Sequence, residues 1–108
     1  MTGADADFLY LTTIGRHSGQ PREIEIWFTR RSGRYYLVAE HREAAQWVQN
    51  LRAEPRVCAR VGDATFDATA RVVDAAAEAE LCTGIRALSE AKYGWGDGLV
   101  VEVTPLST

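Results

Sequence analysis

Short runs in which apolar and polar residues alternate cover most of the chain. Alternation with a period of two is typical of β-strands that bury one face. The pattern predicts six strands, over residues 8–14, 22–30, 34–40, 56–61, 65–73 and 99–104. The clearest is 22–30, where two isoleucines and Phe28 share one face and Trp27 lies on the opposite, mostly charged face. The Gly-containing connection at residues 31–34 predicts that this strand forms a hairpin with the next one.

Two segments instead carry apolar residues at the spacing of a helix. The first covers residues 43–53 and ends before Pro55. Its apolar face consists of Ala44, Trp47, Val48 and Leu51. The second helix is expected to run from Asp74, as its N-cap, to about Ala91. A loop rich in glycine and aromatic residues follows it, and its buried face is expected to contain Leu81, Ile85 and Leu88.

The order of these elements favours a largely antiparallel sheet. Six strands can curl into a small barrel, with a helix over the open seam. A doubly wound parallel sheet needs regular strand–helix alternation, which this order lacks. A length of 108 residues is enough for one domain. The expected fold is therefore α+β and mainly β: a six-stranded, largely antiparallel barrel with two helices, in a single domain over residues 1–108.

Length and charge narrow the function. A chain of this size forms one core with little room for a deep cavity, so a large ligand is expected in a surface groove or between two subunits. The net charge of −3 argues against a nucleic-acid partner. All cations except Lys92 are arginines. Guanidinium groups suit phosphate and carboxylate ligands, although a GC-rich genome explains this bias and the many alanines more simply.

The cysteines and the N-terminus bear on the compartment. Cys58 and Cys82 are far apart and form no CxxC motif, so neither a zinc site nor a redox motif is supported. A disulfide between them stays open, but two reduced, buried thiols are the favoured interpretation. No run reaches the roughly 18 apolar residues of a membrane span, and the N-terminus has no signal-peptide features. We expect no membrane span and a cytoplasmic protein.

The loop over residues 15–22 is the first candidate site. It combines two arginines, a histidine, a serine and two glycines, which together can form a cradle for phosphate or carboxylate groups. Its candidate ligand-binding residues are Arg16, His17, Ser18 and Arg22. Composition alone favours the alternative, a solvated hairpin loop without a specific ligand.

Aromatic residues mark further candidates. Trp27 lies on a charged face and must be covered by a neighbouring strand, a second subunit or a flat ring system. Tyr93 and Trp95 lie on a glycine-rich loop that suits the lip of a pocket and a plug of the barrel end equally well. Trp47 is typical of a core anchor, and His41 follows a strand end, where loops often carry function. With two histidines and no nucleophile motif, we predict no metal site and assign no catalytic residue.

Four motifs carry a resemblance to a known family. In order they read LTTIGRHSGQPR, RYYLVAE, WVQNLRAEPRV and TFDATARVV. Their sequence and spacing resemble those of the deazaflavin-dependent nitroreductases, also called deazaflavin-dependent quinone reductases, over residues 9–105. The resemblance implies a split β-barrel related to flavin-binding reductases. It also implies binding of the deazaflavin coenzyme F420, a hydride carrier with a phosphate and a glutamate tail.

The resemblance assigns roles to nine residues, and His41 is a tenth candidate for the site. The opening loop would hold the anionic tail through Arg16, His17, Ser18 and Arg22. The deazaflavin ring would lie against Ile26 and Trp27, with Ala39 nearby. Trp47 and Asn50 match the helix that closes the site. Many members carry a lysine at the position of His17, and a longer, lysine-containing loop where this chain has His41.

Three functional hypotheses follow. The first is an oxidoreductase that transfers a hydride from reduced deazaflavin to a small-molecule acceptor of the quinone or nitroaromatic type. The second is a barrel that binds a cofactor or hydrophobic ligand without turnover, which the shortened loop favours. The third is a reductase that uses FMN instead. Since the cofactor carries the chemistry in such enzymes, no dedicated catalytic side chain is required. A homodimer is expected, because a small barrel needs a neighbour to cover a large ring.

Overall fold

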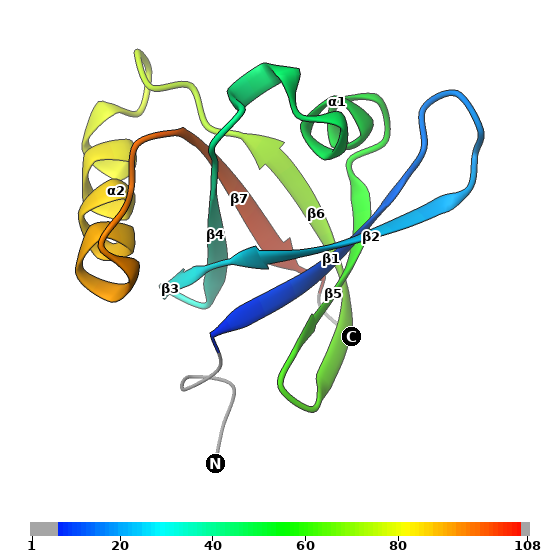
Figure 1. Cartoon of the computed structure of the whole chain (residues 1–108), viewed down its shortest axis with the longest axis horizontal. Coiled ribbons are helices and arrows are strands. Elements are labelled where there is room, and N and C mark those ends of the chain that lie inside the picture. Colours follow the sequence, from blue (N-terminus) through cyan, green and yellow to red (C-terminus); the bar gives the residue numbers. More distant parts are fainter. Residues whose placement is uncertain (1–6, 107–108) are drawn as a thin grey trace.

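The computed structural model describes residues 7–106, and within them it contains seven strands and two α-helices (Figure 1). The strands are β1 (Phe8–Ile14), β2 (Pro21–Trp27), β3 (Thr29–Arg31), β4 (Arg34–Ala39), β5 (Arg56–Val61), β6 (Ala64–Val72) and β7 (Leu99–Pro105). The helices are α1 (Gln46–Ala53) and α2 (Ala79–Tyr93), and a 3-10 turn, η2 (Arg42–Ala44), precedes α1. The architecture is mainly β, as the alternation predicts.

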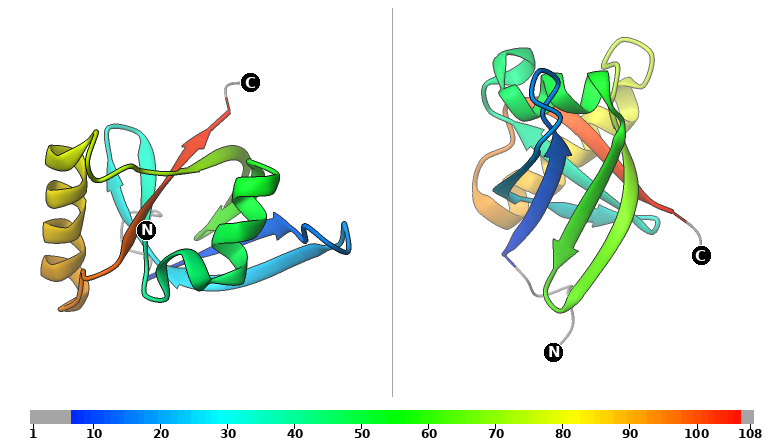
Figure 2. Two further views of the ribbon diagram at one scale, coloured as in Figure 1. Left: turned by 90° about the horizontal axis from the view of Figure 1, so that it is seen from above. Right: turned by 90° about the vertical axis from the view of Figure 1, so that its right-hand side faces the viewer.

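The strands form one antiparallel sheet in the order β2-β1-β5-β6-β7-β4-β3. β2 and β3 are therefore the two edges of the sheet, yet only Phe28 separates them along the chain. The sheet must curl until its edges approach each other, and Figure 1 shows β2 and β3 following one another in almost the same line. The views in Figure 2 show the resulting split barrel.

The prediction of six strands is corrected to seven, because the predicted strand over residues 22–30 is two strands. Pro21–Trp27 pairs with β1, whereas Thr29–Arg31 pairs with β4 at the opposite edge. Alternation reports which face of a segment is buried but not which strand lies beside it. The predicted hairpin with residues 34–40 is thus confined to the short β3. Its turn has Ser32 and Gly33 at φ 54° and 76°, the left-handed pair of a type I′ turn.

Two apolar clusters hold the elements together. The larger lies inside the curl and contains fully buried Leu9, Leu11, Phe28, Leu37 and Val101, among others. The smaller lies between the sheet and α2 and is built from Tyr36, Val73, Cys82, Ile85 and Val100. As Figure 2 shows, α2 stands beside β4 and β7, while α1 lies across one end of the barrel.

The helix predictions need three corrections. α1 begins at Gln46 rather than at residue 43, because the 3-10 turn comes first. α2 begins at Ala79, because the Asp74 carboxylate accepts the backbone N–H groups of Ala76 and Ala77 and so caps a turn instead of the helix. The buried face of α2 consists of Cys82, Ile85 and Ser89. Leu88 was expected there but is 40% exposed, because it lies beside the stripe of Cys82, Ile85 and Ser89 that faces the sheet.

Both cysteines are free thiols, so they form no disulfide with each other. Cys82 lies in the cluster beneath α2, where burial raises the pKa of its thiol above the ordinary value. Cys58 is half-buried. None of the helices formed by residues 7–106 combines the length and the apolar character needed to cross a membrane.

A buried carboxylate connects three strands. Glu102 on β7 lies directly across from Tyr36 on β4 and from Arg71 on β6. It accepts hydrogen bonds of 2.8 Å from the Tyr36 hydroxyl and from Arg71 Nε. Burial raises the pKa of the Glu102 carboxyl, but the hydrogen bonds from Arg71 and Tyr36 outweigh burial and leave the pKa below its ordinary value. The ionised form therefore belongs to the folded state.

The lowered pKa predicts an acid-sensitive contribution to stability. A carboxyl whose pKa is lower in the folded than in the unfolded chain stabilises the fold above the ordinary value of 4.5, and this stabilisation is lost as the pH falls through the lowered value. We expect Glu102→Gln to reduce the free energy of unfolding by about 1–3 kcal/mol at neutral pH. The variant should also lose less stability than the wild type on acidification. Urea unfolding at neutral pH and at a series of lower pH values measures both effects, with the exposed Glu80→Gln as control. Equal acid sensitivity of the wild type and Glu102→Gln would contradict the prediction.

Candidate functional site

The loop between β1 and β2 forms one wall of a surface hollow of about 480 Å³, and α1 forms the other. The loop is closed by backbone hydrogen bonds from Gly15 to Gln20 and from Gly19 to Gly15, both 2.8 Å. Gly19 has φ 71°, which favours glycine. The predicted site residues that line this hollow are Arg16, His17, Ser18, Arg22, Trp47 and Asn50. We call it the cationic hollow.

Arg16 is held in the cationic hollow by neutral groups. Its Nη1 donates to Asn50 Oδ1 and its Nη2 to Gln46 Oε1, both at 2.8 Å. Asn50 Nδ2 in turn donates to Thr13 Oγ1 at 3.4 Å. Amide oxygens fix the guanidinium without cancelling its charge, and three of its five N–H donors remain for a ligand. In the described part of the chain, neither Arg16 nor Arg22 has a carboxylate oxygen within 4.0 Å.

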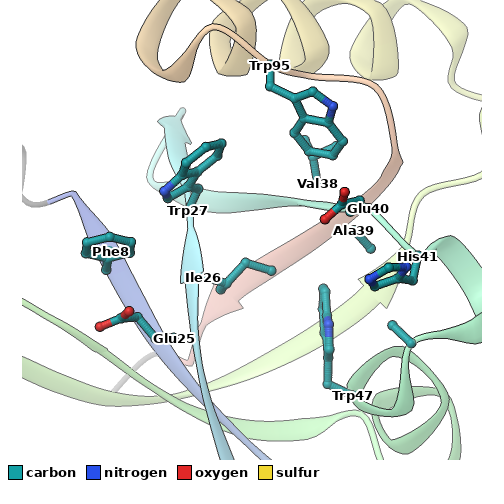
Figure 3. A pocket seen from close by; sticks show the side chains of 11 residues that line it. Phe8, Glu25, Ile26, Trp27, Val38, Ala39, Glu40, His41, Trp47 and Trp95 are labelled. Atoms are coloured by element: carbon teal, nitrogen blue, oxygen red, sulfur yellow. The ribbon is translucent and has the colours of Figure 1, made fainter.

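A second, larger hollow adjoins the first at Trp47, which lines both. Its volume is about 550 Å³, and most of its lining is apolar or aromatic. Figure 3 shows Trp27, Trp47 and Trp95 around this space, with Ile26 and Ala39 between them. We call it the aromatic groove. The predicted site residues that line it are Ile26, Trp27, Ala39, His41 and Trp47.

Trp27 is covered on one face by its own chain. Its ring stacks on that of Tyr93, with the ring centroids 4.5 Å apart and the planes 3° from parallel. The Tyr93 hydroxyl accepts the backbone N–H of Phe28 at 3.1 Å and lies 2.9 Å from the Phe28 carbonyl. Trp27 nevertheless stays 41% exposed and lines the aromatic groove. The last turn of α2 therefore supports the indole from behind and leaves the groove open.

Loss of the Tyr93 ring should change the fluorescence of Trp27. We expect Tyr93→Leu to destabilise the fold by about 0.5–1.5 kcal/mol through the lost ring pair. It should also shift tryptophan emission to the red, because Trp27 gains contact with water. Tyr93→Phe keeps the ring and should keep the emission, although it loses the hydroxyl contacts. Unchanged emission in Tyr93→Leu would mean that the stack does not hold Trp27.

The loop before β7 forms the lip of the groove. The Trp95 carbonyl accepts a 2.6 Å hydrogen bond from Ser89 Oγ, and Arg86 donates to the Gly98 carbonyl through Nε and Nη2. A Cβ at Gly96 would lie 2.3 Å from the Arg86 carbonyl oxygen, so only glycine allows this close approach. Of the two interpretations of the loop, Trp95 agrees with a pocket lip, whereas Tyr93 belongs to α2.

Sequence reasoning missed several lining residues of the aromatic groove. They are Phe8, Glu25, Val38, Glu40 and Ala45. A signal existed for Glu25, because alternation places it on the same face as Trp27. Phe8 lies beside Trp27 through the pairing of β1 with β2. Glu40 follows the end of β4 and reaches the groove only because the sheet curls, so no local pattern marks it. Among the described residues, no three His, Cys, Asp or Glu side chains converge to hold a metal ion.

This arrangement can hold a ligand with two different ends. The cationic hollow suits phosphate or carboxylate groups, because guanidinium forks donate charge-assisted hydrogen bonds to them. The aromatic groove suits a planar ring, which packs well against indole faces. The two hollows meet at Trp47, which lines both.

Solved structures of other proteins share this fold. HutZ, the heme storage protein from Vibrio cholerae, superposes with a TM-score of 0.80 at 19% identity, over 98% of this chain and 86% of that one. An FAD-binding protein from Mesorhizobium loti gives 0.77 at 12% identity, over 97% and 85%. The F420-H2 dependent reductase FDR-A gives 0.63 at 24% identity, over 90% and 93%. At such low identities, these likenesses show a common split-barrel fold.

The sequence itself matches one family. Residues 2–98 match the family described as F420H(2)-dependent quinone reductase. The match includes the loop of the cationic hollow, the strands of the aromatic groove and the helix that carries Trp47. This chain therefore belongs to the F420H2-dependent quinone reductase family.

Proposed function

We propose that this protein is an oxidoreductase that transfers a hydride from reduced F420 to a quinone-like or nitroaromatic acceptor. One observation carries the proposal: a cationic hollow adjoins an aromatic groove, and Trp47 lines both. Family membership supports F420 as the coenzyme, and the two hollows are consistent in character with its two ends.

The residues present fit the coenzyme. Its phosphate and glutamate tail need cations that are not already paired, and Arg16 and Arg22 have no carboxylate within 4.0 Å in the described chain. Glu23 also lines the hollow, but its carboxylate lies 3.8 Å from Arg60 Nη2. The three-ring system needs a flat apolar wall, which Ile26, Trp27 and Ala39 provide. When bound, reduced deazaflavin supplies the hydride.

The protein's own residues would bind and orient the coenzyme and shield its ring from water. Arg16 is held by α1 before any ligand arrives, so little ordering is needed on binding. Trp27 is supported by Tyr93 and gives the ring a fixed plane. Trp47 and Trp95 reduce access of water to the groove between them. No described residue is assigned as an acid or base, because the coenzyme carries the redox chemistry and water can supply the proton that completes the reduced acceptor.

The test measures binding and turnover separately. Purified protein is titrated with oxidised F420 and, in parallel, with FMN, and binding is followed by fluorescence. Reduced F420 is then mixed with 2-methyl-1,4-naphthoquinone, and its oxidation is followed by absorbance. We expect F420 to bind more tightly than FMN and to be oxidised only when protein and quinone are both present.

The outcomes separate the three functional hypotheses. Tight F420 binding without turnover, for quinone and nitroaromatic acceptors alike, would indicate a binding module. Preferential binding of FMN, which also combines fused rings with a phosphate, would indicate that FMN is the coenzyme instead of F420. Absence of binding by either compound would refute the proposal.

A further inference from the structure

The aromatic groove carries negative charge as well as indole rings. Two carboxylates line it, Glu25 and Glu40, and none of its described lining residues is a lysine or arginine. Figure 3 shows Glu25 beside Phe8 at one end and Glu40 between Trp95 and Trp47 at the other. A ligand in the groove would therefore lie near Glu40, with Glu25 at the outer edge of the groove.

Neither carboxylate is neutralised by a neighbour. Within residues 7–106, no arginine, lysine or histidine nitrogen lies within 4.0 Å of either one. Glu25 accepts a 2.6 Å hydrogen bond from the Tyr10 hydroxyl, which positions the carboxylate and leaves its charge in place. Arg60 lies over the Tyr10 ring, but its guanidinium pairs with Glu23 rather than with Glu25.

The two hollows therefore have opposite charge on the two sides of Trp47. The cationic hollow attracts anions, whereas Glu25 and Glu40 repel them from the groove. Indole faces add to this preference, because the negative face of an aromatic ring attracts cations. Both carboxylates are exposed, so their effect is screened by salt over roughly 10 Å at 0.1 M ionic strength.

We propose that Glu25 and Glu40 select the acceptor by charge. A flat aromatic cation binds the groove most tightly, a neutral ring of the same size binds less tightly, and a ring with a carboxylate or sulfonate is disfavoured. That the selected molecule is a hydride acceptor rests on the proposed function. The charge preference itself rests on the groove and applies to the protein without coenzyme.

The test compares three planar probes of the same ring size. N-methylphenazinium, phenazine and phenazine-1-carboxylate are titrated into the protein, with and without bound F420, by isothermal titration calorimetry in the dark. At low salt we expect the Kd of the carboxylate to exceed that of the cation by at least about tenfold, and the ratio to shrink as salt screens the charges. The double variant Glu25→Gln, Glu40→Gln should reduce the ratio to about threefold or less, which is the part left to the indole faces.

Glu80→Gln is the matched control, because this exposed glutamate lies in the first turn of α2, outside both hollows. It should keep the wild-type ratio. Equal Kd values for the three probes, absence of binding by all of them, or a ratio that survives the double variant would each overturn the inference.

A second measurement distinguishes this inference from the proposed function. The KM values of 1,4-naphthoquinone and its 2-sulfonate are compared in the presence of reduced F420. If both are reduced with equal KM and the probes show no preference, the charge selection fails and the reductase stands. If neither quinone is reduced but the probes bind in the expected order, the reductase fails and the charge selection stands.

Discussion

Arg16→Ala is expected to weaken binding of F420 by about 10- to 150-fold. Hydrogen bonds to a charged group contribute roughly 1.5–3 kcal/mol, and about 1.4 kcal/mol corresponds to a factor of ten. Arg16 is placed for this role, because Asn50 and Gln46 hold two of its donors and leave the others for an anion. Fluorescence titration of wild type and variant measures the change.

Two further variants separate charge from structure. Arg22→Ala removes a cation that lines the same hollow but does not tie the loop to α1, so a loss of affinity there reports the ligand alone. Arg56→Ala removes an exposed arginine that pairs with Asp67 and does not line the hollow, and it should bind F420 as the wild type does. Wild-type affinity in both Arg16→Ala and Arg22→Ala would remove these residues from the site.

Phe28→Ala is expected to reduce the free energy of unfolding by about 3–5 kcal/mol, the usual cost of emptying a fully buried aromatic site. Phe28 is 1% exposed and is the single residue between the two edge strands. Its ring packs at 5.9 Å from that of Tyr35, and Lys92 Nζ lies 3.9 Å from its centroid. The substitution therefore leaves a cavity where the barrel closes. Urea unfolding followed by circular dichroism measures the loss.

Phe8→Ala is the matched control for stability, because Phe8 is the same residue type and is 38% exposed. It should lose less stability than Phe28→Ala, since more than a third of its surface already contacts water, whereas Phe28 is fully buried. If the two variants lost equal stability, the junction would not be the point where core packing closes the barrel.

The spacing of apolar and polar residues along the chain predicted most of the strands and helices correctly. The predicted strands at Phe8–Ile14 and Arg56–Val61 have those bounds in the structure. Each has one neighbour in sequence and one buried face, so local alternation contains what is needed. It failed at residues 22–30, where the partner changes from β1 to β4 without any change in alternation. It also failed at Leu88, because an apolar residue beside the buried stripe of a helix has the same local pattern as one within it.

The candidate site shows the same division. All ten residues predicted to bind the coenzyme line one of the two hollows, and their role toward the coenzyme remains a prediction. Tyr93 was placed in a flexible loop, yet it stacks on Trp27 and bonds to Phe28, 65 positions away. Glu40 carried no local signal as a lining residue of the groove. Its role depends on where the end of β4 meets Trp95 and Trp47.

By itself, the sequence determined most of the strands, the turn after the first strand and the family, because each depends on neighbours along the chain or on a motif in a fixed order. Only the tertiary structure decided that the two edges of the sheet meet at Phe28. It also decided that the cationic hollow adjoins the aromatic groove at Trp47, and that Glu25 and Glu40 both line that groove. The physical reason is that curling of the sheet brings together side chains that are distant in sequence, and local propensity contains no information about that approach.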